Sequence, residues 1–179
     1  YKEAKKQGIH PILGSEIYLS RSMEERFIQK GEARYYHLVL LAENDTGYHN
    51  LMKLVSLGFT EGYYYKPRVD YEVLEKYHEG IIALSACLAG EVSRNLRLSQ
   101  YEEAKQAALR YEGIFGKGNF FLEMQDHDYA EQKLVNQGML RLHEETGIPL
   151  VVTNDIHYTY KEDAKAHDIL LCLQTGKKL

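Results

Sequence analysis

Short hydrophobic segments alternate along the chain with longer segments in which apolar residues recur every three or four positions. Short apolar runs predict strands, and the longer periodicity predicts amphipathic helices. The predicted strands are Pro11–Ser20, Tyr35–Ala42, Ile81–Ala86, Asn119–Met124 and Pro149–Asn154. The predicted helices are Tyr48–Leu57, a short helix from Asp70 to near His78, Glu91–Leu98, Tyr101–Phe115, Glu131–Thr146 and Glu162–Thr175. This alternation favours an α/β fold with a parallel sheet covered by helices, and the pattern alone leaves barrel and open sheet as alternatives.

The remaining segments are less regular. Arg21–Ala33 is polar and charged, and Phe59–Val69 is predicted to be a tyrosine-rich loop. The chain opens in a helix-like segment, Tyr1–Gln7, without an initiator methionine, and Gly8 follows as a C-cap signal. We therefore expect the chain to be a segment cut from a longer protein.

Composition narrows the class of protein. The 179 residues predict one domain, and the net charge of −4 gives no global basic surface of the kind that dominates nucleic-acid binding. No signal peptide or membrane-spanning run is evident, so no membrane partner is expected. Only Cys87 and Cys172 occur, too few for a disulfide scaffold, which favours a cytoplasmic location.

The last predicted strand ends in two residues that can bind a metal ion, Asp155 and His157. Alternate residues of an extended chain project to the same face, so both side chains are expected to point the same way. A carboxylate and an imidazole so placed suit Zn²⁺ or Mn²⁺. The alternative is an N-cap aspartate and a surface histidine at a strand–helix junction.

Further potential ligands lie on or just after the other predicted strands. Glu16, His37 and Cys87 offer the oxygen, nitrogen and sulfur atoms that zinc-class ions prefer. Cys87 alone is typical of a small buried hydrophobic residue, and His37 of a hydrogen-bonded core histidine. Glu16 lies among apolar residues, where a carboxylate needs a cation, an arginine or a helix N-terminus to offset its desolvation.

Two other features are open to alternative interpretations. Lys66 and Arg68, beside the tyrosines of the predicted loop, are possible contacts for a phosphodiester, or simply solvated charges on a tyrosine-packed loop. His127 follows the fourth predicted strand and is a weak candidate for catalytic proton transfer, or a surface histidine in a polar turn.

Several longer strings, taken together, resemble one family. They are Lys5–Glu16, His37–Asn44, Gly47–Leu51, Tyr64–Arg68, Leu84–Gly90, Thr153–His157 and His167–Gly176. In this order they resemble the N-terminal PHP (polymerase and histidinol phosphatase) domain of bacterial DNA polymerase III α subunits, and the resemblance runs nearly end to end.

The resemblance implies a distorted (β/α)7 TIM-like barrel that holds metal ions at the C-terminal ends of its strands. It also implies that residues 1–179 are a single PHP domain fragment without its first strands, because the family's opening ligands lie upstream of Tyr1. Glu16, His37 and Cys87 resemble the ligands of one metal, and Asp155 and His157 resemble the last two ligands of the cluster. Zn²⁺ or Mn²⁺ is the expected ion, with Mg²⁺ in the polymerase active site of the parent protein.

The function implied by the resemblance is DNA replication by a DNA-directed DNA polymerase. The domain itself is then a metal-dependent phosphoesterase or 3′–5′ exonuclease-like module, and the fragment alone is expected to be a poor catalyst. One alternative is a silent scaffold that stabilises the polymerase and docks a separate proofreading exonuclease subunit. A free-standing small-molecule phosphatase of the same superfamily ranks lowest. The expected partners are DNA and other replicase subunits.

Overall fold

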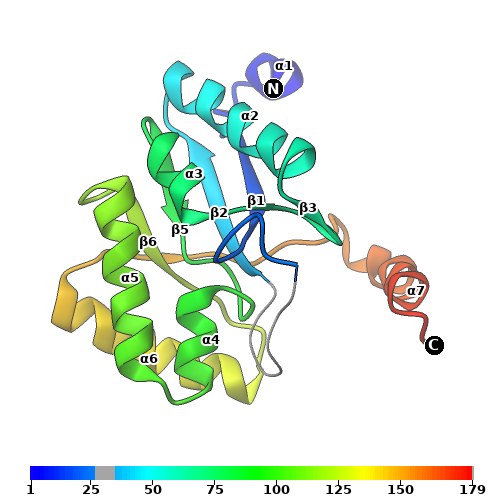
Figure 1. The fold of residues 1–179 in the computed structure, drawn as a ribbon. Coiled ribbons are helices and arrows are strands. Elements are labelled where there is room, and N and C mark those ends of the chain that lie inside the picture. Colours follow the sequence, from blue (N-terminus) through cyan, green and yellow to red (C-terminus); the bar gives the residue numbers. More distant parts are fainter. Residues whose placement is uncertain (27–34, 179) are drawn as a thin grey trace.

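The computed structural model describes residues 1–26 and 35–178 (Figure 1). The predicted polar segment Arg21–Ala33 lies largely outside these residues. The strands are β1 (Gly14–Leu19), β2 (Tyr36–Ala42), β3 (Tyr63–Tyr64), β4 (Lys66–Val69), β5 (Ile81–Leu84), β6 (Phe120–Met124) and β7 (Leu150–Val152). The helices are α1 (Lys2–Lys6), α2 (Asp45–Thr60), α3 (Tyr71–Lys76), α4 (Glu91–Arg97), α5 (Tyr101–Phe115), α6 (Ala130–Thr146), the 3₁₀ turn η1 (Lys161–Asp163) and α7 (Ala164–Thr175).

The strands of the described residues form one mixed sheet in the order β3-β4-β1-β2-β5-β6-β7. β5, β6 and β7 are parallel, as expected, and β1 is parallel to β4. However, β2 runs antiparallel to both β1 and β5, so the predicted all-parallel sheet is wrong. The sheet has two ends and is not closed, so the fold is α/β but the barrel is not confirmed.

Alternation along the central strands separates the two faces of the sheet. Ile17 and Leu19 of β1 and Leu38 and Leu40 of β2 are buried in the hydrophobic core. The residues that alternate with them along each strand, such as Glu16 and His37, project to the opposite face, where they are only partly covered. One face of the sheet therefore supplies the core, and the other is available for chemistry.

Helix α2 packs on the core face over β2 and β4, as Figure 1 shows. Asn44 caps its N-terminus by accepting a hydrogen bond from the Gly47 amide at 3.0 Å. Gly47 also lies against Gly80, and a Cβ at Gly47 would come within 1.7 Å of the Gly80 carbonyl oxygen. This close approach explains a glycine inside the first turn of a helix.

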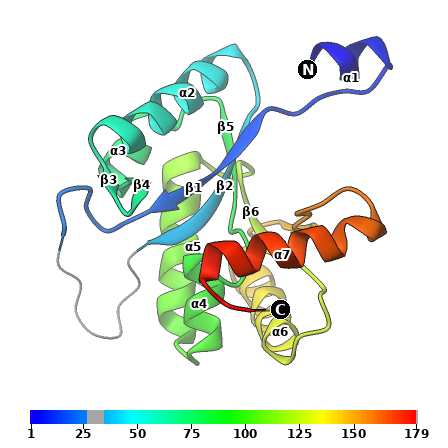
Figure 2. The ribbon, with the colours of Figure 1, turned by 90° about the vertical axis from the view of Figure 1, so that its right-hand side faces the viewer.

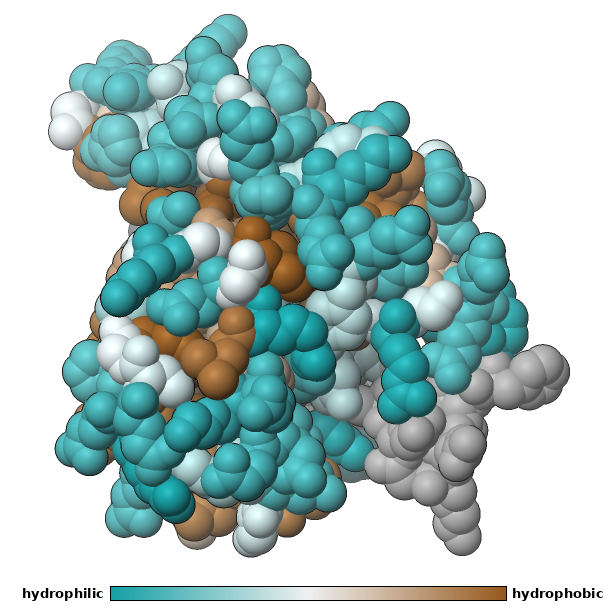
Figure 3. Space-filling model, turned by 60° about the vertical axis from the view of Figure 1, so that its left-hand side comes forward, coloured by the Kyte–Doolittle hydropathy of each residue, from teal (hydrophilic) through white to brown (hydrophobic). Residues whose placement is uncertain are grey.

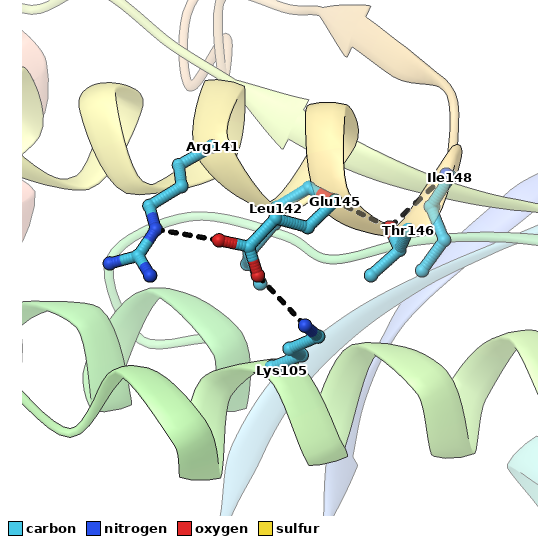
Figure 4. Close-up of polar contacts among 6 residues, drawn as sticks. All are labelled: Lys105, Arg141, Leu142, Glu145, Thr146 and Ile148. Carbon is cyan, nitrogen blue, oxygen red and sulfur yellow. Dashed lines mark hydrogen bonds and ion pairs between the residues drawn. The ribbon is translucent and has the colours of Figure 1, made fainter.

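Helices α5 and α6 pack against each other and against β6. Figure 4 shows that Glu145 of α6 accepts hydrogen bonds from Lys105 of α5 and from Arg141, each at 2.8 Å. These two cations lower the pKa of Glu145 to about 2. The ion pairs therefore link two helices that cover the same strand.

Helix α7 lies apart from this assembly, on the side away from α5 (Figures 1 and 2). None of its residues is buried, and Ile169 and Leu173 are among its exposed apolar side chains. On the face drawn in Figure 3, hydrophilic side chains predominate and hydrophobic ones form small separate patches. Among the described residues, no helix combines the length and apolar character needed to cross a membrane.

The sequence-based prediction missed a short hairpin and extended the last strand too far. The predicted loop Phe59–Val69 contains the end of α2 and a short hairpin, β3–β4, with Tyr65 in the left-handed region at φ 61°. The last strand ends at Val152, two residues before the predicted end at Asn154. The residues that follow it are therefore not held in a strand.

Candidate metal centre

Pairing of β1 with β2 brings Glu16 and His37 together. Glu16 lies opposite Val39, and His37 is two residues earlier on the same strand, so the two side chains are diagonal neighbours on one face. The rings of Tyr18 and Tyr35 pack beside the imidazole of His37, with centroid distances of 5.3 and 6.2 Å. These contacts restrict the orientation of the imidazole.

The third side chain, Cys87, comes from the turn after β5. Ala86 adopts the left-handed conformation at φ 63°, and the Gly90 amide donates to the Cys87 carbonyl at 2.9 Å. The His37 amide donates to the Ala89 carbonyl at 3.1 Å, which ties this turn to β2. A Cβ at Gly90 would come within 2.1 Å of the Ser85 carbonyl oxygen, so the tight turn requires glycine there.

The three side chains converge on His37 Nδ1. This atom lies 3.0 Å from Glu16 Oε1 and 3.7 Å from Cys87 Sγ. The hydrogen bond with Cys87, together with the one that the imidazole donates to Glu16, raises the pKa of His37 to about 10. In the metal-free protein the imidazole is therefore protonated at neutral pH, and a metal ion that binds it must displace that proton.

The spacing of these donor atoms fits a metal ion. One donor atom from each of Glu16, His37 and Cys87 lies within 4.8 Å of the other two. Tetrahedral ligands at about 2.0–2.3 Å from zinc are about 3.3–3.8 Å apart, near the 3.0 and 3.7 Å that separate His37 Nδ1 from the other two donor atoms. Three protein ligands are also typical of a zinc site that keeps a position open for water or substrate. The side chain of Glu16 is 39% exposed, so it is less desolvated than its apolar neighbours in the sequence suggested. The case for a metal ion therefore rests on the distances between the donor atoms.

Two adjoining cavities connect this cluster with the segment after β7. The first, of about 390 Å³, has both Cys87 and Asp155 in its lining. The second, of about 450 Å³, shares Asp155 and His127 with the first and continues to His157. Of the sequence-predicted ligands, Cys87, Asp155 and His157 therefore line these two cavities, whereas Glu16 and His37 line neither of them.

Asp155 and His157 do not have the predicted arrangement. Asp155 has a left-handed backbone at φ 47°, and His157 Nδ1 lies 2.7 Å from the Asp155 carbonyl oxygen. The predicted strand does not continue through Asp155, because the chain turns there, so the strand geometry from which both side chains were expected to point the same way is wrong. Neither residue joins the cluster of Glu16, His37 and Cys87 within the described part of the chain.

A buried polar network supports the base of this segment. The hydroxyl of Thr153 donates to Glu123 Oε1, and the amide of Gln125 donates to the same oxygen at 3.1 Å. Glu123 is 5% exposed, and its Oε2 has no hydrogen-bond partner among the described residues. The network joins the C-terminal ends of β6 and β7 directly below Asp155.

The two basic residues of the β3–β4 hairpin have different environments. Arg68 is 1% exposed, and its guanidinium donates to the backbone carbonyls of Gly62, Glu25 and Met23 at 3.0–3.2 Å. It is therefore not available to a phosphodiester, and its predicted DNA contact is corrected to a structural role. Lys66 is exposed, with its ammonium group 5.3 Å from the centre of the Tyr18 ring.

Sequence reasoning missed two arginines of this region. Arg94 and Arg97 of α4 line the first cavity together with Cys87. Their spacing of three residues on a predicted helix, shortly after a predicted ligand, was the signal that could have revealed them.

Fold and site together define an α/β protein with a candidate metal centre beside an open cavity. Residues 1–127 match the PHP domain family, and the chain belongs to this family. The DNA polymerase III subunit alpha of Borreliella burgdorferi is 44% identical over 99% of the chain, and that of Treponema pallidum is 47% identical over 98%. The Thermus aquaticus protein of the same name is 41% identical over the whole chain. The chain spans only 15–16% of the length of these relatives.

Proposed function

We propose that the chain is the PHP domain of a bacterial DNA polymerase III α subunit, and that this domain is a metal-dependent phosphoesterase with 3′–5′ exonuclease-like activity. The observation that carries the proposal is the convergence of Glu16, His37 and Cys87 on one point next to an open cavity. The parent protein is then a DNA-directed DNA polymerase of the cytoplasm that works with DNA and other replicase subunits. The similarity of the chain to polymerase subunits over nearly its whole length supports this assignment.

The candidate site residues would have different roles in hydrolysis. Glu16, His37 and Cys87 would hold one divalent ion, with Zn²⁺ or Mn²⁺ favoured by the mixed donor set, and Asp155 and His157 would serve neighbouring ions. When bound, such ions polarise a phosphoryl oxygen and lower the pKa of a bound water. His127 borders both cavities and is the candidate for proton transfer, and Lys66 remains a predicted phosphate contact outside them.

The proposed fold of the complete domain is a closed, distorted (β/α)7 barrel. The parallel strands β5, β6 and β7 and their covering helices support it. In this arrangement residues 1–179 form part of a single PHP domain, whose further strands complete the sheet.

The direct test measures metal content and hydrolysis in the full-length parent protein, with single-stranded DNA as substrate and no deoxynucleotides present. We expect bound zinc or manganese and a metal-dependent release of nucleotides, both reduced by Asp155→Asn. The matched control is Asp168→Asn on α7, which removes a charge outside both cavities. Polymerase activity in each variant shows whether the protein is folded.

The scaffold alternative gives a different result. If the parent protein holds its metal fully but hydrolyses neither single-stranded DNA nor phosphate esters, the domain is a structural module. The exposed apolar residues of α7, such as Leu173, would then be candidates for contact with another replicase subunit.

A further inference from the structure

The first cavity carries a pair of cations that the proposed metal chemistry does not use. Arg94 and Arg97 are three residues apart on α4, so they lie on the same side of the helix, and both line the cavity. Arg94 is partly buried and Arg97 is exposed. Within the described part of the chain, Arg97 forms no salt bridge.

The charges around this cavity favour an anion. Among the residues that the structure describes, the lining contains these two arginines and His127 together with one carboxylate, that of Asp155. Asp155 is itself a proposed metal ligand, so its charge would be offset by the ion. Guanidinium groups bind phosphate oxygens through paired, charge-assisted hydrogen bonds.

The remaining wall fits a nucleoside. Tyr35 and Tyr129 line the same cavity, and Tyr129 is 59% exposed, so its ring is open to a ligand. Aromatic side chains beside cationic ones are the usual combination for single-stranded nucleic acid, because bases stack on rings while phosphates pair with charges. The volume of about 390 Å³ also lies in the range of about 300–1,000 Å³ typical of small-molecule sites.

We propose that this cavity is the substrate phosphate subsite of the domain, in which Arg94 and Arg97 bind the phosphate of a terminal nucleotide and Tyr129 contacts its base. Cys87 belongs both to the metal cluster and to the wall of the cavity, so a phosphate held there lies next to the metal centre. The proposal rests on the proposed phosphoesterase function, since it names the group on which such a centre acts. Arg94 and Arg97 bind and orient the substrate, and they hold no metal.

The experiment measures equilibrium binding of inorganic phosphate and of thymidine 5′-monophosphate to the full-length parent protein by calorimetry. We expect Arg94→Gln and Arg97→Gln each to weaken the binding of both probes by about tenfold, through loss of a charge-assisted contact. Tyr129→Leu should weaken the binding of the nucleotide by at least about fivefold and leave the binding of inorganic phosphate unchanged. Lys117→Gln is the matched control, because Lys117 precedes β6 and lies at the opposite end of that strand from the cavity.

Two results would overturn the proposal. Arg97 is exposed, so Arg97→Gln does not threaten folding. If this variant binds both probes with wild-type affinity, the proposed arginine contact is refuted. Equal binding of phosphate and nucleotide in the wild type defeats the nucleotide assignment.

The same variants separate this proposal from the proposed function. Metal-dependent hydrolysis with an unchanged KM in both arginine variants would refute the subsite and keep the function. The opposite result is a wild-type protein that holds no metal but binds phosphate, with that binding lost in the arginine variants. It would refute the proposed phosphoesterase function and keep an anion site.

Discussion

Cys87 is the most informative single residue of the candidate metal centre, because a sulfur ligand gives a spectroscopic signal that oxygen and nitrogen ligands do not give. We predict that Cys87→Ser weakens zinc binding by about 100-fold or more, since even the outer hydrogen-bond partners of ligands are worth about 10–100-fold. Calorimetric titration of the metal-free parent protein with Zn²⁺ measures this change. With Co²⁺ in place of zinc, the sulfur-to-metal charge-transfer band should disappear.

Cys172 provides the control for this substitution. It is the other free cysteine, it lies on α7 and it takes no part in the cluster. Cys172→Ser should leave both the affinity and the spectrum unchanged. Equal behaviour of the two variants would remove Cys87 from the set of ligands.

Arg68 illustrates a residue whose type suggests one role and whose environment gives it another. Arg68→Ala removes the donor for three backbone carbonyls, and we expect it to lower the free energy of unfolding by about 2–4 kcal/mol. Chemical denaturation measures this loss. The exposed neighbour Lys66 is the control, and Lys66→Ala should change stability by no more than about 0.5 kcal/mol. Equal stabilities would mean that the buried contacts of Arg68 are not needed.

The candidate ligands were predictable from the sequence to different degrees. Glu16, His37 and Cys87 were found as potential ligands on or just after predicted strands, the resemblance assigned them to one metal, and the structure brings them together. The geometry of Asp155 was not predictable, because its left-handed backbone depends on a turn that the residue type does not specify. The burial of Arg68 depends on contacts with residues about 45 positions away, which local sequence does not reveal.

At the level of elements, one carboxylate joins three helices. Glu91 of α4 accepts hydrogen bonds from the hydroxyls of Tyr71 and Tyr111, each at 2.7 Å, and from Arg110 at 2.6 Å. Burial, together with the charge of Glu91, raises the pKa of both tyrosines, so their hydroxyls remain donors. This cluster fixes the start of α4, directly after the turn that carries Cys87.

We predict that Glu91→Ala lowers the free energy of unfolding by about 2–4 kcal/mol, because it leaves a fully buried tyrosine hydroxyl without an acceptor. Thermal and chemical denaturation measure the loss. Glu103→Ala on the exposed side of α5 is the matched control and should cost no more than about 0.5 kcal/mol. If the two variants are equally stable, the cluster does not anchor α4.

The link between α5 and α6 predicts a dependence of stability on pH. Lys105 and Arg141 lower the pKa of Glu145 from 4.5 to about 2. A lowered pKa in the folded state means that the contribution is complete above about pH 4.5 and is lost as pH falls toward 2. The difference in melting temperature between the wild type and Glu145→Gln should therefore shrink over this range.

The control for this comparison is Glu144→Gln, an exposed neighbour on the same helix. It should show no such dependence on pH. Added salt should also reduce the effect of Glu145, because the pairs are exposed to solvent. A difference that stays constant from pH 6 to pH 2.5 would contradict the proposed link.

At the scale of the whole molecule, element types were easier to predict than strand directions. The apolar periodicity located the main helices and the central strands, since each buries one face or stripe. The antiparallel direction of β2 was missed, although the sequence contained a signal for it. Parallel neighbours need a crossover, usually helical, and no helix was predicted between β1 and β2.

The central claim is that atoms from three separate segments of the chain meet to bind one metal ion. Anomalous X-ray diffraction from crystals of the parent protein, recorded at the zinc and manganese absorption edges, tests this directly. The account predicts a peak about 2.0–2.3 Å from the donor atoms of Glu16, His37 and Cys87. The absence of a peak at this position in metal-supplemented crystals, or a peak coordinated by other residues, would contradict it.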